Sequence, residues 1–378
     1  MKCVFCKEEL GAVNQLNLEH CVSSDHRPIK LHLGKTQCPK CFLMQAVRTK
    51  NWYQQVNYIY ESYRAYEISM GSEQLVFQSD GIGNARSDVL VRQVVKESGT
   101  RLRWLDFGAG DGTLLETVHR IDPEASLFAY DLSTQAEQAV RSRAPISGFY
   151  SSMAEIGTDY DVIILSHVLE HVDNPRAVLV DLIERLSTEG QIVIQVPNVG
   201  ENPFDLVVFD HVSHFDQFTL EALLQSVGQL NFLSTETVAK EIVASIGRDK
   251  SRQGSARTIE FGVGFDTLKT TNSIDFMSQR LWRVAEASRR EHLNIGALGI
   301  FGTSIAANWV SGFLGDRQTF WVDEDPARIG KTWQGKQIMD LDQMANGASL
   351  LVPFVGGLGT NLLDRILSAA TSQRIILL

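Results

Sequence analysis

The sequence has no run of roughly 18 apolar residues, and its start, MKCVFCKEEL, has no apolar segment long enough for a signal peptide. It also has no block of lysines and arginines. Its 35 basic residues are outnumbered by 45 acidic ones, which gives a formal net charge of −10. Nucleic acid and membranes are therefore not expected as partners, because both attract basic surfaces. We expect a cytoplasmic protein.

Cysteine is scarce, and four of the five cysteines form two pairs, Cys3-x-x-Cys6 and Cys38-x-x-Cys41. Two thiolates at this spacing can bind one tetrahedral metal ion, and two such pairs complete a four-cysteine zinc shell. Four protein ligands leave no open position, so we predict a Zn²⁺ ion that stabilises a small module rather than performing chemistry. Unliganded thiols, an iron–sulfur cluster and a redox dithiol are the alternatives.

A strand-like segment followed by a glycine-rich turn is the strongest motif. Leu105–Gly112 reads LDFGAGDG, and Asp131 follows 19 residues later, after a second expected strand. In a nucleotide-binding βαβ unit the glycines let the backbone approach a ligand, and the acid binds a ribose diol. A dinucleotide fingerprint would place its third glycine where Thr113 stands. Because Asp106 and Asp111 flank the turn, we expect a ligand with an amino group and no pyrophosphate.

Five strand-like segments alternate with helical patterns and predict the central fold. The expected strands cover residues 103–107, 126–130, 149–152, 160–166 and 191–197. Largely apolar strands separated by helices are typical of a parallel sheet covered on both faces, so we predict an α/β, Rossmann-like fold. Ligands bind beyond the carboxyl ends of such strands, where the residues after each strand share one rim.

These motifs resemble those of class I methyltransferases that use S-adenosylmethionine (SAM). LDFGAGDG is similar to their first motif, and HVLEHVDNP, residues 167–175, is similar to their fourth. The resemblance implies that the glycine turn holds the methionine part of SAM, that Asp131 holds the ribose hydroxyls, and that His167 lies near the methionine end. The cofactor-binding residues implied in this way are Asp106, Gly108, Ala109, Gly110, Gly112, Asp131, Leu132, Met153, Ser166 and His167.

A second βαβ-like unit begins near residue 296. Strands are expected at 297–301 and 319–322, with a turn at Gly302–Ser304 and an acid, Asp323, after the second strand. One glycine in the turn is weak evidence for a nucleotide site. A nucleotide site and a purely structural Rossmann-like half therefore both remain open.

Taken together, the cysteine module, the central domain and the C-terminal unit resemble the three-domain C-methyltransferases that act on nucleotide-linked deoxy-keto-sugars. The C-terminal phrases GIFGTSIAANW and VDEDPARIGKTWQGKQI agree with that family in order and position. The resemblance implies a nucleotide sugar as the substrate, bound with help from the C-terminal domain. We expect a zinc module at residues 1–48, a helical connection at 49–98, a SAM-binding domain at 99–240 and a Rossmann-like substrate domain at 241–378. A monomer and a homodimer are both compatible with the sequence.

The candidate catalytic residues follow the fifth strand, where residues 208–215 read VFDHVSHF. The resembled family has a phrase close to Tyr-His-Glu-His followed by Tyr-Phe. His211 matches its second histidine and Asp210 its glutamate, but the early tyrosine–histidine pair is absent. We predict that His211 is a general base that forms an enolate, that Asp210 orients a histidine, and that His214 is a second base or a donor to the enolate oxygen.

The missing tyrosine–histidine pair leaves the acceptor open. SAM-dependent O- or N-methylation of a sugar or another small molecule is the alternative to C-methylation. The polar residues of the segment have a structural alternative as well, because Asp216 is a plausible N-cap for a helix that begins near Gln217. A nicotinamide-dependent enzyme would need a complete glycine fingerprint, which neither βαβ unit has. A non-catalytic zinc-bearing protein is a further alternative class.

Overall fold

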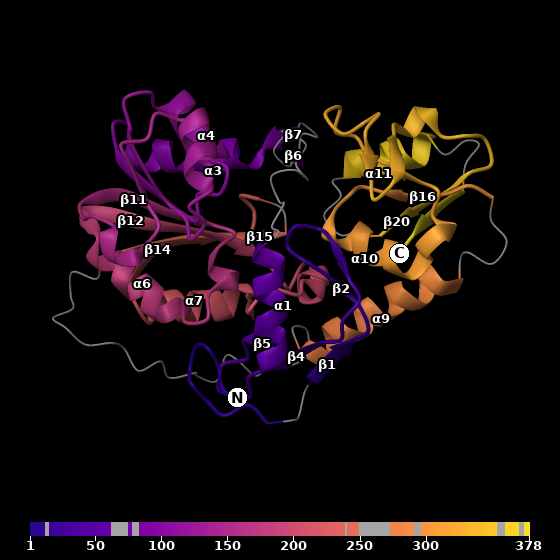
Figure 1. Ribbon diagram of the computed structural model, residues 1–378, viewed down its shortest axis with the longest axis horizontal. Coiled ribbons are helices and arrows are strands. Elements are labelled where there is room, and N and C mark those ends of the chain that lie inside the picture. Colours follow the sequence, from indigo (N-terminus) through magenta and orange to yellow (C-terminus); the bar gives the residue numbers. More distant parts are fainter. Residues whose placement is uncertain are drawn as a thin grey trace.

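The computed structural model shows a central domain, a C-terminal domain and an N-terminal region that contacts both (Figure 1). It describes residues 1–11, 15–61, 75–77, 83–238, 240–248, 273–290, 296–353, 360–369 and 374–378. Within these residues, no helix combines the length and the apolar character that crossing a membrane requires.

A seven-stranded sheet with the order β10-β9-β8-β11-β12-β15-β14 forms the central domain. Only β15 runs antiparallel to the other strands. The strands are β8 Arg103–Phe107, β9 Ser126–Tyr130, β10 Gly148–Tyr150, β11 Tyr160–Ser166, β12 Leu186–Pro197, β14 Gln229–Ser234 and β15 Glu241–Gly247. The predicted α/β fold is confirmed, and three of the five expected strands have the expected bounds.

Helices cover both faces of this sheet, which explains its buried strands. The helices are α3 Arg86–Ser98, α4 Thr113–Ile121, α5 Ala136–Arg143, α6 Pro175–Glu184 and α7 Gln217–Gln225. In Figure 1, α3 and α4 lie above the sheet and α6 and α7 below it. Because β11 is covered on both sides, its residues 162–165 are completely buried.

The N-terminal region forms a second, antiparallel sheet that includes a strand of the central domain. Its order is β1-β4-β5-β13, and the last strand, β13 Ser213–His214, carries a predicted catalytic histidine. The other elements are β1 Gln15–Leu18, β2 Cys21–Val22, β3 Pro28–Ile29, β4 Leu33–Gln37, β5 Met44–Ala46 and α1 Lys50–Glu61. The predicted metal-binding module and the predicted catalytic segment therefore share one sheet.

Two expectations about the connections need correction. Residues 49–98 are not helical throughout, because strands β6 Leu75–Phe77 and β7 Gly83–Ala85 pair between α1 and α3. The boundary expected at residue 240 falls inside the central sheet, since β15 pairs with both β12 and β14. A short, largely apolar stretch such as EIVASIG does not reveal by itself which sheet it joins.

The C-terminal domain has a six-stranded sheet with the order β18-β19-β17-β16-β20-β21. Its strands are β16 Leu298–Phe301, β17 Phe320–Val322, β18 Thr332–Trp333, β19 Lys336–Met339, β20 Ser349–Val352 and β21 Arg374–Leu377, and its helices are α9 Ile274–Arg290, α10 Ile305–Leu314 and α11 Thr360–Ala369. Short 3₁₀ turns lie at η1 Met153–Glu155, η2 Leu169–His171, η3 Pro203–Val207, η5 Gly315–Arg317 and η6 Leu341–Gln343. The predicted second βαβ-like unit is present as β16, α10 and β17.

Candidate active site

The glycine turn lies between β8 and α4, at the carboxyl end of β8. Gly108 has φ of 90° and Gly112 φ of 84°, a region that glycine enters without strain. A Cβ atom on Gly108 would lie 2.4 Å from Val168 Cγ2, and one on Gly112 would lie 2.8 Å from Val140 Cα. Glycine is therefore required at both positions, because the turn is tightly packed and in the left-handed region.

Asp131 holds the turn from the end of the neighbouring strand. Its carboxylate accepts hydrogen bonds from the backbone N–H of Gly110, at 2.9 Å, and of Ser133, at 2.8 Å. The N–H groups of Gly108 and Ala109 both bond to the carbonyl oxygen of Tyr130. The predicted acid and the predicted turn thus form one hydrogen-bonded unit at the rim of the sheet.

Asp106 lies beneath this turn and is almost fully buried. Burial, assisted by the negative charges of Asp131 and Asp111, raises the pKa of the Asp106 carboxyl to about 8. A cationic group placed beside these three acids would favour the ionised form of Asp106. The arrangement suits a ligand with an ammonium group, as the sequence indicated.

The other predicted cofactor residues lie after neighbouring strands of the same sheet. Leu132, directly after Asp131, is 81% exposed, and Met153 begins η1 after β10. Ser166 ends β11, and its hydroxyl donates to Gln195 Oε1 at 2.9 Å. Because all of them follow carboxyl ends of parallel strands, they occupy the rim where ligands bind in this fold.

His167 is held in an unusual backbone conformation between two carboxylates. Its φ is 54°, and its ring nitrogens lie 3.3 Å from Glu170 Oε1 and 3.3 Å from Glu241 Oε1. Burial opposes a positive charge on the ring, but these carboxylates raise the pKa of His167 to about 9. Arg86, at the start of α3, also pairs with Glu241, at 3.0 Å. The two carboxylates therefore favour the protonated form of His167.

His211 and His214 share one carboxylate, that of Asp205 in η3. His211 Nδ1 lies 2.7 Å from Asp205 Oδ1, and His214 Nδ1 lies 2.5 Å from Asp205 Oδ2. Burial opposes the charged form of His211, but Asp205 raises its pKa above the ordinary value. Burial and the cation of Lys35 lower the pKa of His214 to about 4. The pKa values of the two histidines are therefore shifted in opposite directions although they share a partner.

Asp205 was not among the predicted residues, and Asp210 has a different environment from the one expected. The Asp210 carboxylate accepts from the N–H of Ser24, at 2.8 Å, and from its hydroxyl, and it lies 3.7 Å from His171 Nδ1. Asp205 rather than Asp210 contacts the two candidate histidines. The available sequence signal for Asp205 was an acidic residue six positions before His211.

The turn η2 connects His211 to the rim of the central sheet. Val212 N donates to the carbonyl of Glu170 at 2.8 Å, and the rings of His171 and His211 are 4.7 Å apart, edge to face. Tyr60, from α1, places its hydroxyl 2.9 Å from His171 Nδ1. The motif after β11 and the segment after β12 thus pack together, as neighbouring strands in a parallel sheet require.

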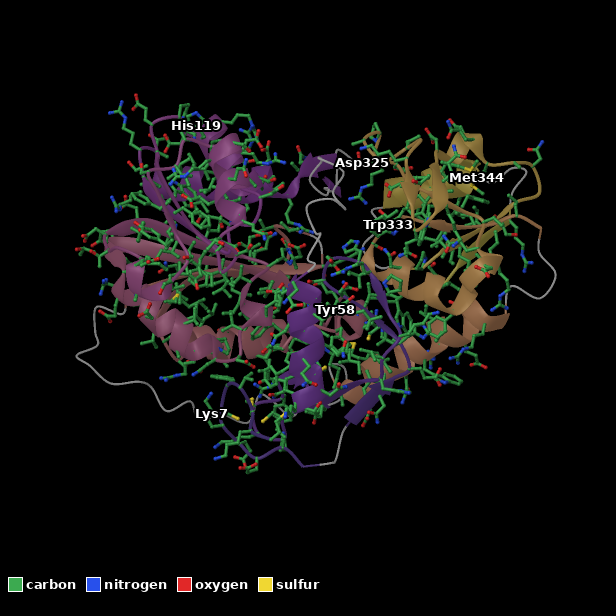
Figure 2. The ribbon with its side chains drawn as sticks, in the orientation of Figure 1. Lys7, Tyr58, His119, Asp325, Trp333 and Met344 are labelled. Carbon is green, nitrogen blue, oxygen red and sulfur yellow. The ribbon has the colours of Figure 1, made fainter. Side chains whose placement is uncertain are left out.

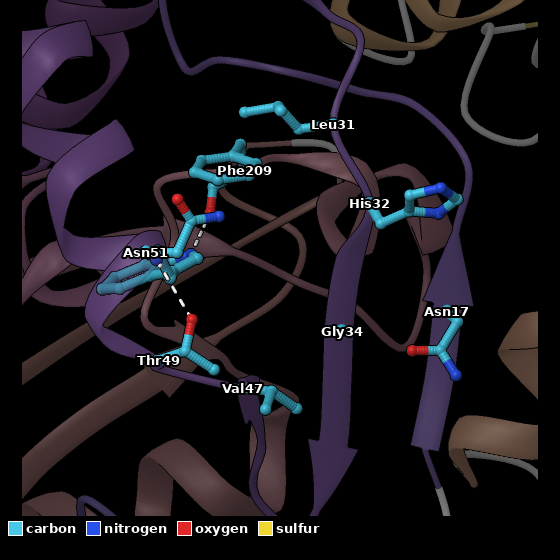
Figure 3. A pocket seen from close by; sticks show the side chains of 9 residues that line it. Asn17, Leu31, His32, Gly34, Val47, Thr49, Asn51 and Phe209 are labelled. Atoms are coloured by element: carbon cyan, nitrogen blue, oxygen red, sulfur yellow. Dashed lines mark hydrogen bonds between the residues drawn. The ribbon is translucent and has the colours of Figure 1, made fainter.

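A surface hollow of about 340 Å³ lies on the N-terminal region, close to the His211 segment (Figure 3). Trp52 is one of its lining residues, and its Nε1 donates to the carbonyl of Phe209 at 3.0 Å. The lining residues are Asn17, Leu31, His32, Gly34, Val47, Thr49, Asn51, Trp52 and Phe209. None of the predicted cofactor or catalytic residues lines this hollow.

The four predicted metal ligands lie together at the N-terminus. Cys3 Sγ is 3.5 Å from Cys41 Sγ, and Cys6 Sγ is 3.5 Å from Cys38 Sγ; all four sulfurs lie within 4.8 Å of one another. Tetrahedral zinc with bonds of about 2.3 Å separates its sulfur ligands by about 3.8 Å, so the donor set fits. Cys21 lies apart from this cluster, with its thiol directed at the carbonyls of Ile29 and Leu31.

In the C-terminal unit, the acid after the second strand, Asp323, has different partners from Asp131. Asp323 accepts from the Thr303 hydroxyl at 3.3 Å and pairs with Arg328 at 3.5 Å. The Thr303 carbonyl lies 2.8 Å from His26 Nδ1 of the N-terminal region. Asp325 and Trp333 lie on the side of this domain that faces the central domain (Figure 2).

Comparisons with known proteins agree with the geometry of the central domain. A family model described as a methyltransferase domain matches residues 82–229. Residues 82–229 form a class I SAM-dependent methyltransferase domain. The predicted cofactor SAM is supported by this match, and the glycine turn, Asp131 and the motif after β11 all lie inside the matched range.

Curated relatives match parts of this chain. The mitochondrial ubiquinone biosynthesis O-methyltransferase of Schizosaccharomyces pombe is 31% identical over 24% of this chain and 36% of its own length. The trans-aconitate 2-methyltransferase of Mycobacterium marinum is 32% identical over 28% of this chain and 41% of its own length. The chain thus spans less than half the length of these relatives.

A solved structure also matches the chain in part. The TehB-like SAM-dependent methyltransferase of Corynebacterium glutamicum is 12% identical, covers 53% of this chain and 97% of its own, and has a TM-score of 0.35. The matched range of the family model, residues 82–229, excludes the cysteine cluster and the C-terminal domain.

Proposed function

We propose that the protein is a SAM-dependent methyltransferase in which His211 removes a proton from the acceptor. The observation that carries the proposal is the His211–Asp205 pair, with a separation of 2.7 Å, packed against the turn that follows the SAM-side strand β11. Asp205 fixes the tautomer with a proton on Nδ1, so Nε2 is the nitrogen available to the acceptor. When bound at the glycine turn, SAM would supply the electrophilic methyl group.

The acceptor that we propose first is a carbon next to the ketone of a nucleotide-linked deoxy-sugar. His211 Nε2 would take the proton from that carbon, and the resulting enolate carbon would form the new bond to the methyl group while the sulfonium bond breaks. The imidazole rings of His171 and His214 lie next to His211, with centroids 4.7 Å and 5.9 Å from that of His211. The proposal rests on the three-part resemblance of the sequence.

O-methylation is the second candidate, because curated relatives of the domain are named O-methyltransferases. In that case His211 would take the proton of a hydroxyl group, and the alkoxide oxygen would accept the methyl group. The same base and the same orienting carboxylate serve both reactions, since each needs one proton acceptor near the methyl group.

Product analysis separates the two candidates. Purified protein is incubated with SAM carrying a ¹³C methyl group and a panel of dTDP-, GDP- and CDP-linked keto-sugars, and the products are examined by mass spectrometry and carbon NMR. A methyl signal in the aliphatic carbon range supports C-methylation, and one in the methoxy range supports O-methylation. SAM binding without any methylated sugar would contradict the sugar acceptor and leave the methyltransferase assignment intact.

We also propose that Cys3, Cys6, Cys38 and Cys41 bind a structural Zn²⁺ ion. The support is the fit of the four sulfur atoms to a tetrahedral shell. Metal analysis should find about one zinc per chain, and Cys38→Ser should lower both the zinc content and the melting temperature. Folded protein with essentially no metal would contradict the proposal.

A further inference from the structure

Backbone carbonyls of the His211 segment, residues 208–214, are held by donors from the N-terminal region. Lys35 Nζ donates to the carbonyl of Val208 at 2.8 Å and to that of His211 at 3.1 Å. Ala46 N donates to the carbonyl of Val212 at 2.9 Å. The position of His211 along this segment is therefore determined by a part of the chain remote in sequence.

Lys35 is an unusual residue for its place. It lies on β4, and none of its surface is exposed. Burying an ammonium group is costly, so a lysine that only filled space would be better replaced by an apolar side chain. Burial lowers the pKa of Lys35 to about 7, opposed by the charges of Asp205, Cys21 and Asp210. An apolar side chain could fill the same volume, so the hydrogen-bond donors and the charge of Lys35 are what a lysine adds at this buried position.

The charged groups around His211 and His214 show how Lys35 affects the protonation of the two histidines. Asp205, Glu170 and Asp210 favour the protonated form of His211. His214 is deprotonated by burial and by Lys35, which together outweigh Asp205. The charge of Lys35 thus lowers the pKa of His214. Its hydrogen bond to the carbonyl of His211 holds the backbone of that residue.

We propose that Lys35 is a positioning residue that fixes His211 against Asp205, so that the N-terminal region supplies part of the active site. β4 and β5 form a hairpin, and the turn between them contains Cys38 and Cys41, so the cysteine cluster lies at the end of the element that carries Lys35. The proposal rests on the proposed role of His211 as the base.

Histidine NMR titration tests this proposal without an acceptor. The full-length protein is labelled with ¹³C at the histidine Cε1 positions, and the signals are assigned with His211→Asn and His214→Asn. In Lys35→Met, loss of the charge should raise the pKa of His214. Loss of the carbonyl bonds should loosen the contact of His211 with Asp205 and lower the pKa of His211. Lys30→Met, which removes an exposed lysine of the same region, should change neither value.

Opposed shifts of the two histidines support the proposal. An unchanged His211, or a His211 that shifts upward together with His214, overturns it, because removing a cation without moving the ring raises both pKa values. If Lys35→Met loses its cooperative thermal transition, Lys35→Gln replaces it, since the amide retains a donor for one carbonyl. The same opposed shifts are then expected, with a smaller one for His211, and the same result overturns the proposal.

Calorimetric titration with SAM keeps the two proposals distinct. SAM affinity should be the same within about twofold in Lys35→Met and in the wild type, because Lys35 contacts the His211 segment rather than the glycine turn. Failure of the wild type to bind SAM contradicts the proposed function, whereas the histidine shifts report on Lys35 in either case.

Discussion

The two βαβ units of the chain share a layout but differ in how the acid after the second strand is used. In the central domain Asp131 accepts the backbone N–H of Gly110, in a turn where Gly108, Gly110 and Gly112 all have positive φ. In the C-terminal domain Asp323 also accepts the N–H two residues on, that of Asp325, but it contacts its turn through the Thr303 hydroxyl rather than through a backbone N–H, and it pairs with Arg328. The comparison teaches that the layout alone does not specify a cofactor site. The packing of the turn and the partners of the acid carry that information.

The largest effect is expected from adding a methyl group to each turn. Gly108→Ala should lower SAM affinity by about 100-fold or more, because the new Cβ overlaps Val168 and the left-handed φ is strained. Gly302→Ala is the matched control, since Gly302 also has a left-handed φ, of 76°, but its Cβ would meet only Ser304 N, at 3.9 Å. Its SAM affinity should stay within about twofold of wild type. Calorimetry measures both, and equal losses would contradict the comparison.

Neutralising the acid of each unit should have the next largest effect. Asp131→Asn should weaken SAM binding by roughly 10- to 100-fold, because a charged acceptor of the turn and of the ribose hydroxyls is lost. Asp323→Asn should leave SAM affinity unchanged and reduce the melting temperature by a few degrees, because Arg328 loses an ion pair. A larger loss of SAM affinity in Asp323→Asn than in Asp131→Asn would place the cofactor in the C-terminal unit and contradict our account.

The buried acid below the central turn makes SAM binding depend on pH. Asp106 has a pKa of about 8 in the free protein, so it is largely protonated at pH 6 to 7. An ammonium ligand favours the ionised carboxylate, so binding should release a proton, and affinity should rise by up to about tenfold per pH unit below pH 8. Calorimetry in buffers of different ionisation enthalpy measures the released proton. Asp106→Asn should abolish this release.

The same group gives a smaller, opposite effect on the unliganded protein. Because the pKa of Asp106 is higher in the folded than in the unfolded chain, the folded state binds more protons between about pH 4 and pH 8. Its contribution therefore destabilises the fold progressively as the pH rises through this window. Asp106→Asn should raise the melting temperature at pH 8 more than at pH 5. Equal changes at both pH values would show that Asp106 is ionised throughout.

Much of the central domain could be predicted because its signals are local. The strand β11 follows from the apolar segment YDVIILS, and the N-cap at Asp216 follows from its position before α7, where Asp216 and Thr219 form a capping box. The glycine turn is likewise encoded by consecutive residues, 108–112. Such features depend on neighbours within one or two turns of chain, which a sequence displays directly.

The parts that could not be predicted depend on contacts between distant segments. Ser213–His214 is too short and too polar to suggest a strand, and it becomes β13 only because β5 pairs with it. Lys35 resembles any surface lysine in the sequence, and its buried contacts with residues 208 and 211 arise from tertiary structure. Asp205 lies six residues before His211, but its contact with both histidines depends on the packing of η3 against them, which that spacing does not show.

A crystal structure of the chain with S-adenosylhomocysteine tests the central claim most directly. Our account predicts one ligand on the glycine turn, with its ribose hydroxyls at Asp131 and its amino group beside the cluster of acids that contains Asp106. A ligand seated between Gly302 and Asp323, with the central turn empty, would contradict the account.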